Sequence, residues 1–133
     1  MEIKFYKRDF LLKISENKFL HSLKAAVGEE YDIFPQIHMD AFVDTHSDKA
    51  LWRMVMPFSV DFLLCEKKDF KPILAIELNG YSHDDPAQKE KDVFKRNTLN
   101  EIGLPLLEIA TQNGDEYNSE DIKSKIKDIL NNK

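Results

Sequence analysis

Two carboxylates stand inside apolar stretches of this sequence. Asp61 interrupts the run 58–65, and Glu77 interrupts the run 73–79. A charged side chain is seldom buried without a partner, and neighbouring carboxylates repel one another unless a cation lies between them. Mg²⁺ takes oxygen ligands and often needs only one or two carboxylates plus a substrate phosphate. The pair therefore predicts a site for Mg²⁺ or Mn²⁺; the alternative is two separate surface acids, each paired with a lysine.

Both acids are expected on the same side of a β-hairpin, because side chains alternate across a strand. The opposite side should be core, formed by Val60, Phe62 and Leu64 on the first strand and by Leu74, Ile76 and Leu78 on the second. The short turn 66–71 favours an antiparallel pair. Asn79 shares the face of Glu77 and could add a carbonyl oxygen or hold a water.

Two residues outside the hairpin could join this site. Glu16 precedes Phe19 and Leu20 by three and four positions, so it lies on or beside the inward face of a helix. It can equally be an acid in the first turn that favours the helix dipole. His83 follows the second strand and could act as a general acid or base, contact a phosphate or bind a second metal, or be an ordinary loop histidine.

The helix after the hairpin carries further charged candidates. Asp92 and Arg96 are four residues apart, which predicts a supporting ion pair. Lys91 and Lys95 give the same helix a basic character, which indicates either a solvated face or phosphate contacts.

The elements that must position these residues follow from periodicity and turn residues. Helical spacing and capping residues predict helices over Ser15–Val27, from about Asp85 to before Gly103, and over Ser119–Leu130. Strands are predicted over Tyr31–Met39, Phe58–Cys65, Pro72–Asn79 and 104–110. The stretch Asp40–Met56 receives no element. The order predicts an α/β fold with a mixed β-sheet flanked by helices.

The order of these motifs resembles the PD-(D/E)xK nuclease superfamily, most closely the branch that includes very-short-patch repair endonucleases. The resemblance lies in "SVDF", "AIELNGYSH", the Asp and Arg on the following helix, and "GLPLLEI". It covers Glu16 and most of Phe58–Ile109, over a third of the chain. It implies a restriction-endonuclease-like core and Mg²⁺-dependent hydrolysis of DNA phosphodiesters.

Residue by residue, the resemblance implies that Asp61 and Glu77 hold the divalent metal. Glu16 is similar to the helical acid that can orient a metal-bound water, and His83 is similar to the histidine that often assists cleavage. Asp92 and Arg96 are similar to the helix pair that supports the site.

The sequence departs from the superfamily at Asn79, where Lys or Asp is usual. Asn carries no charge and takes no proton at neutral pH. Three explanations follow: a lysine reaches in from elsewhere, with Lys91 and Lys95 as candidates; metal and His83 suffice; or the domain binds without cutting.

Composition limits the function classes. A chain of 133 residues suits one domain, here taken as residues 1–133. A net charge of -5 argues against a sequence-blind nucleic-acid coat but is compatible with a metal site. The single cysteine, Cys65, fits a reducing compartment, and no apolar run is long enough to cross a bilayer. Composition therefore predicts a cytoplasmic protein without a membrane segment, and the resemblance implies a Mg²⁺-dependent DNA endonuclease. The alternatives are an inactive nuclease-fold module that binds nucleic acid or a protein, and a metal-dependent hydrolase of another substrate class.

Overall fold

The sheet of this protein is mixed and has four strands in the order β1-β2-β3-β4. The computed structural model describes residues 4–79, 85–110 and 117–132. The strands are β1 (Tyr31–His38), β2 (Ser59–Glu66), β3 (Pro72–Asn79) and β4 (Leu106–Ala110). The first three strands pair antiparallel and β4 pairs parallel to β3. Because β1 is an edge strand, Pro35 is tolerated within it.

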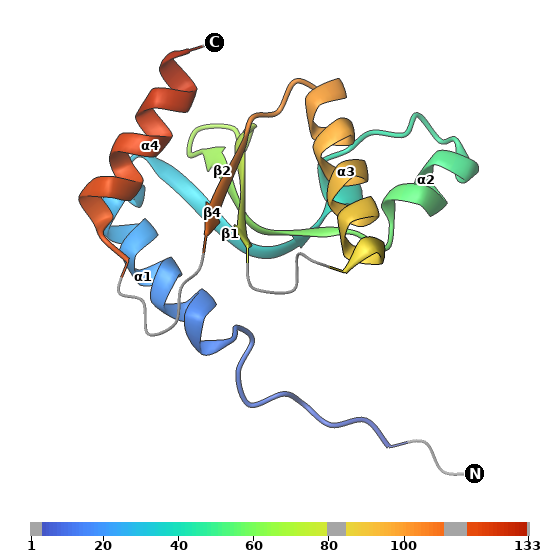
Figure 1. Cartoon of the computed structure of the whole chain (residues 1–133), viewed down its shortest axis with the longest axis horizontal. Coiled ribbons are helices and arrows are strands. Elements are labelled where there is room, and N and C mark those ends of the chain that lie inside the picture. The colour runs from blue at the N-terminus through green and yellow to red at the C-terminus, as the bar shows by residue number, and fades with distance from the viewer. Residues whose placement is uncertain (1–3, 80–84, 111–116, 133) are drawn as a thin grey trace.

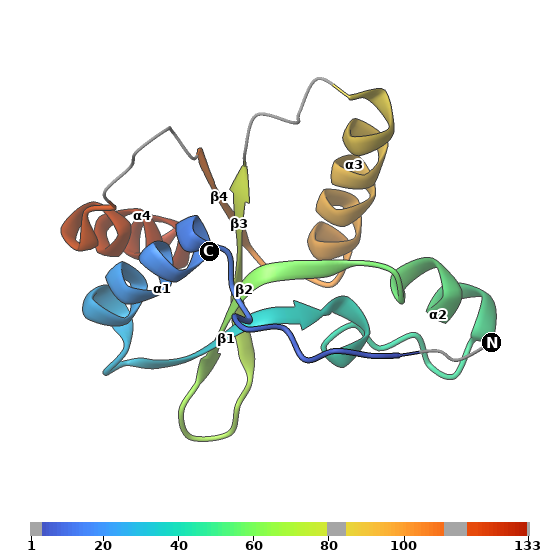
Figure 2. The same cartoon turned by 90° about the horizontal axis from the view of Figure 1, so that it is seen from below.

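Helices cover both faces of this sheet. The α-helices are α1 (Ile14–Val27), α2 (Lys49–Val55), α3 (Pro86–Glu101) and α4 (Ser119–Asn131), and η1 (Met39–Ala41) is a single 3-10 turn. Figures 1 and 2 show α1 and α4 side by side on one face, and α3 with α2 on the other. The predicted mixed sheet flanked by helices is confirmed. None of the described helices is both long and apolar enough to span a membrane.

Local signals explain where the helices begin. Asp85 caps α3, because its side chain accepts from the Ala87 N–H, and Pro86 occupies the first helical position. Asn118 caps α4 in the same way. Asp48 caps α2 by accepting from the N–H groups of Ala50 and Leu51. The α2 helix lies within Asp40–Met56, the stretch for which the sequence predicted no element.

Two apolar clusters hold the layers together. The larger one, between the sheet and the α1/α4 pair, contains Phe19, Leu23, Phe62, Leu64, Leu74, Ile76, Leu107, Ile109, Ile122 and Ile126, among others. The second lies toward α2 and α3 and includes Met39, Val55, Leu63, Ala75 and Leu99. The face that bears Glu77 is therefore partly core as well, because Leu63 and Ala75 on it are buried.

The predicted position of Val60 is wrong. This residue was predicted to share the core face of Phe62, but it belongs to the second cluster. The strand pair is irregular at this point, since Gln36 on β1 has a φ of 50°. Figure 2 shows β2 turning as it runs from α2 toward the rest of the sheet, so the simple alternation of faces does not hold across this bend.

Candidate metal and catalytic site

Asp61 and Glu77 lie next to one another on the α3 side of the sheet. The Leu78 N–H donates to Asp61 Oδ2 at 2.7 Å, which joins the β2 acid to the backbone of β3. The side chains of Asp61 and Glu77 line the same cavity. The two acids therefore lie on the same face of the β2–β3 hairpin, as the alternation of side chains predicts.

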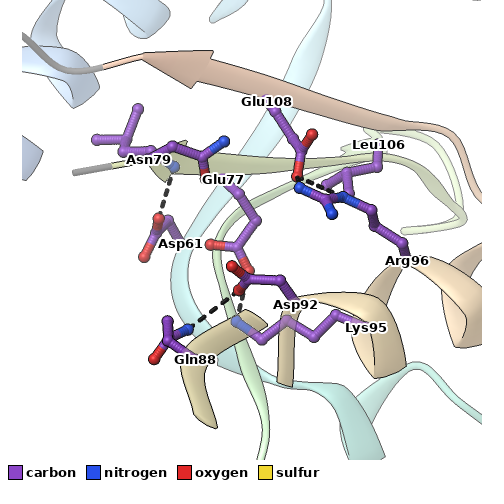
Figure 3. A pocket seen from close by; sticks show the side chains of 10 residues that line it. Asp61, Glu77, Asn79, Gln88, Asp92, Lys95, Arg96, Leu106 and Glu108 are labelled. Atoms are coloured by element: carbon purple, nitrogen blue, oxygen red, sulfur yellow. Dashed lines mark hydrogen bonds and ion pairs between the residues drawn. The ribbon is translucent and has the colours of Figure 1, made fainter. Parts of the chain in front are cut away.

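The pair opens into a cavity of about 220 Å³ between the sheet and α3. Its lining residues are Asp61, Glu77, Leu78, Asn79, Gln88, Asp92, Lys95, Arg96, Leu106 and Glu108. Figure 3 shows these side chains converging from β2, β3, β4 and α3. Asn79 thus lines the same cavity as the two acids, at the end of β3.

A lysine from α3 reaches the acids. Lys95 Nζ lies 2.7 Å from Glu77 Oε1, and the two side chains are only 18% and 13% exposed. Lys91, the other candidate from the sequence, is exposed and does not line the cavity. A cation therefore stands beside Glu77 even though position 79 is Asn.

The environment of Glu77 favours its neutral form. Burial, followed by the hydrogen bond and the negative charge of Asp61, raises the pKa of Glu77 from 4.5 to about 8, and Lys95 only partly opposes this shift. Glu77 therefore holds a proton at neutral pH. A divalent cation bound to the same oxygens would displace that proton.

Glu16 belongs to the same network through a residue that the sequence did not single out. Glu16 Oε1 accepts from the Lys13 N–H at 2.9 Å, so the first-turn role is real. Its other oxygen accepts from Gln36 Nε2, and that amide also lies 3.4 Å from Asp61 Oδ1. Only its polarity beside Pro35 and Ile37 marks Gln36 in the sequence. Its partners are 20 and 25 residues away and could not be inferred.

The main partner of Arg96 is Glu108, and the negative charge of Asp92 acts on Arg96 as a smaller effect. Arg96 Nη2 lies 2.8 Å from Glu108 Oε1, and its Nε donates to the same oxygen at 2.9 Å. Asp92 accepts from Gln88 Nε2 at 3.0 Å. Arg96 turns to β4 because Glu108 is the parallel-register neighbour of Glu77. Because this contact depends on long-range strand pairing, the sequence did not indicate Glu108 as a site residue.

The remaining candidate, His83, lies outside the described residues. Within the described part of the chain, no group of three or more His, Cys, Asp or Glu side chains is placed to hold a metal. The donor set is two carboxylates beside an open cavity of about 220 Å³, which fits Mg²⁺ or Mn²⁺ completed by water and phosphate oxygens. It does not suit Zn²⁺, which favours Cys and His.

Fold and site together define a mixed α/β domain with a carboxylate pair in a cavity at one sheet face. The chain belongs to DUF2726, a family described as protein of unknown function, whose profile matches residues 8–129. It is 27% identical over 112 residues to an uncharacterized protein of Haemophilus influenzae. That match covers 82% of this chain, which spans 58% of the length of the relative. No solved structure matches the chain.

Proposed function

We propose that the domain is a Mg²⁺- or Mn²⁺-dependent DNA endonuclease of the PD-(D/E)xK type. The observation that carries this proposal is the juxtaposition of Asp61, Glu77 and Lys95 in one cavity, with Lys95 Nζ 2.7 Å from the Glu77 carboxyl. The sequence resemblance named Asp61 and Glu77 as metal ligands, and their placement supports that role. Lys95 supplies the positive charge that Asn79 lacks.

The two carboxylates would hold the metal. Once bound, Mg²⁺ polarises a scissile phosphate and lowers the pKa of an attacking water. The protein's own groups do the rest. Asp61 is fixed by the Leu78 N–H. Lys95, with its side chain only 18% exposed, presents its ammonium group to charge that develops beside Glu77.

The positions of the cationic side chains, rather than their total number, support nucleic acid as the substrate. Residues 4–13 form an arm without helix or strand that leaves the N-terminal end of α1 (Figure 1). It carries four cationic side chains and one acid, although the whole chain has five more acids than bases. Phe5, Tyr6 and Phe10 on this arm are more than 80% exposed. Cationic side chains interleaved with exposed aromatic ones suit phosphate contacts and base stacking.

A nicking assay on supercoiled plasmid tests the proposal. The wild type should nick DNA with Mg²⁺ or Mn²⁺ and not with EDTA, and Asp61→Asn and Glu77→Gln should each abolish nicking. The matched control is Glu108→Gln, because Glu108 lines the same cavity but bonds Arg96. It should retain most activity. Nicking that survives loss of either proposed ligand would reject the assignment.

A second candidate is a nuclease-fold module that binds nucleic acid or a protein without cutting it. It is favoured by Asn79 and by the ion pair that already satisfies Glu77. Lys95→Met separates the two candidates. For the endonuclease, this change should keep or strengthen Mg²⁺ binding, since a competing cation is removed, while it lowers cleavage about 10²–10³-fold. For the binding module, the wild type should cleave nothing with any divalent ion.

A further inference from the structure

One amide in the molecule contacts two carboxylates that come from different elements. Gln36 on β1 donates through Nε2 to Glu16 at the start of α1, and the same nitrogen lies 3.4 Å from Asp61 Oδ1 on β2. A glutamine amide has two N–H donors, so one group can serve two acceptors. Asp61 is thereby held from two sides, by Gln36 at one oxygen and by the Leu78 N–H at the other.

The register of the sheet explains this contact. Pro35 pairs with Phe62 and Ile37 pairs with Val60, so Gln36 and Asp61 lie opposite one another between these pairs. Gln36 has a φ of 50°, in the left-handed region where Gly and Asn are better accommodated. Backbone conformations of this kind persist where surrounding structure imposes them, and they cluster at functional sites.

We propose that Gln36 is a positioning residue that fixes the orientation of the Asp61 carboxylate and keeps Glu16 beside it. The inference rests on the proposed function in one respect, since it takes Asp61 to be a metal ligand. Hydrogen-bonding partners that orient metal-binding side chains usually change metal affinity when they are removed. Gln36 occupies a position whose backbone would suit glycine better, because only a long amide reaches both acids.

A purely structural role makes a different prediction. If Gln36 only joined α1 to the sheet, every effect of its removal would follow the loss of stability. Two substitutions separate these cases. Gln36→Ala removes the amide and keeps the strained φ, whereas Gln36→Gly removes the amide and relieves the strain. The glycine variant should therefore have the higher melting temperature of the two.

The first measurement needs no metal. The Leu78 N–H bonds Asp61 Oδ2, so its amide proton shift and exchange rate report on the carboxylate. Both variants should move the Leu78 amide proton upfield and speed its exchange to a similar extent, whatever their melting temperatures. Gln88→Ala is the matched control, because it removes a glutamine that lines the cavity and bonds Asp92 instead of Asp61. It should leave Leu78 unchanged. A Leu78 signal that stays in place in both Gln36 variants would overturn the inference.

The second measurement is Mn²⁺ binding by calorimetry on the full chain. Both Gln36 variants should bind Mn²⁺ about 10-fold more weakly than the wild type. Affinities that follow the melting temperatures instead would contradict a positioning role. If the wild type binds no Mn²⁺ while Leu78 still moves in the variants, the positioning of Asp61 stands and the proposed nuclease function fails.

Discussion

The two faces of the sheet differ in how completely apolar side chains cover them. On one face, α1 and α4 cover a continuous apolar cluster centred on Phe62, Leu74 and Ile76, all fully buried. On the other face, the apolar cluster under α2 and α3 covers only part of the sheet, and the rest opens into the cavity that contains Asp61 and Glu77. Figure 2 shows the helices of the two layers on opposite sides of the strands.

This difference places the larger apolar cluster and the two acids on opposite sides of the same strands. Among the described residues, no polar or charged residue is fully buried. The acids lie at the border of the second cluster, where burial raises the pKa of Glu77 to about 8 although the side chain lines an open cavity. A charge in the first cluster would be desolvated without a partner, which is costly. Substitutions at neighbouring positions of one strand test whether the two faces contribute differently to stability.

The largest expected effect is at Ile76, the neighbour of Glu77 that points to the α1/α4 cluster. Ile76 is fully buried, so Ile76→Ala should lower the free energy of unfolding by about 2–5 kcal/mol. Glu77→Gln at pH 6 should change it by less than about 1 kcal/mol, because Gln resembles the protonated acid that the raised pKa predicts. Urea denaturation of both variants measures the contrast. Equal losses would show that the Glu77 face also carries the stability of the fold.

The second prediction concerns pH. The pKa of Glu77 is about 8 in the folded protein and 4.5 without the fold, so the folded state binds the extra proton between these values. Its contribution to stability is complete below pH 4.5 and is lost as the pH rises toward 8. The slope is at most about 1.4 kcal/mol per pH unit.

Glu77→Gln provides the control for this slope. Urea denaturation at pH 5.5, 6.5 and 7.5 should show that the wild type loses stability relative to the variant as the pH rises. Mg²⁺ should reverse part of the loss in the wild type alone, since the metal replaces the proton and binds more tightly at higher pH. A difference between the two proteins that is flat with pH would mean that Glu77 is ionised throughout, held by Lys95 as a structural ion pair.

Much of this architecture was readable from local patterns. The strand Pro72–Asn79 was predicted with the bounds observed, since an apolar run between two turns admits few alternatives. The start of α3 followed from Asp85 and Pro86. The α2 helix was missed because its apolar residues do not form one stripe: Leu51, Trp52 and Met54 are all more than 40% exposed. Without a buried stripe there is no helical period to detect.

The site also contains residues that local sequence patterns predicted and residues that they did not. Asp61 and Glu77 stood out because each breaks an apolar run. Gln36 and Glu108 did not, because their importance comes from partners that are distant in the sequence. Gln36 contacts Asp61 on β2, and Glu108 bonds Arg96 on α3. Lys95 could be named as one of two candidates from its helix, but only packing decides that it reaches Glu77 and that Lys91 does not.

The smallest expected effect concerns the pair at the rim of the cavity. Arg96 and Glu108 are bonded through one carboxylate oxygen, but their side chains are 48% and 35% exposed, so solvent screens the attraction. A double-mutant cycle with Arg96→Met and Glu108→Gln should give a coupling energy of about 0.2–1 kcal/mol in the free energy of unfolding. The coupling should fall further in 1 M NaCl, where screening acts over about 3 Å.

The same variants sharpen the comparison of the two faces when their DNA affinity is measured beside their free energy of unfolding. If Arg96 contacts substrate phosphate, Arg96→Met should weaken DNA binding far more than it lowers stability, and Glu108→Gln should not weaken it, since that change frees the guanidinium. If both single variants lower stability by several kcal/mol instead, the rim pair is part of the fold's framework. The cavity face would then share the stabilising role assigned here to the α1/α4 face.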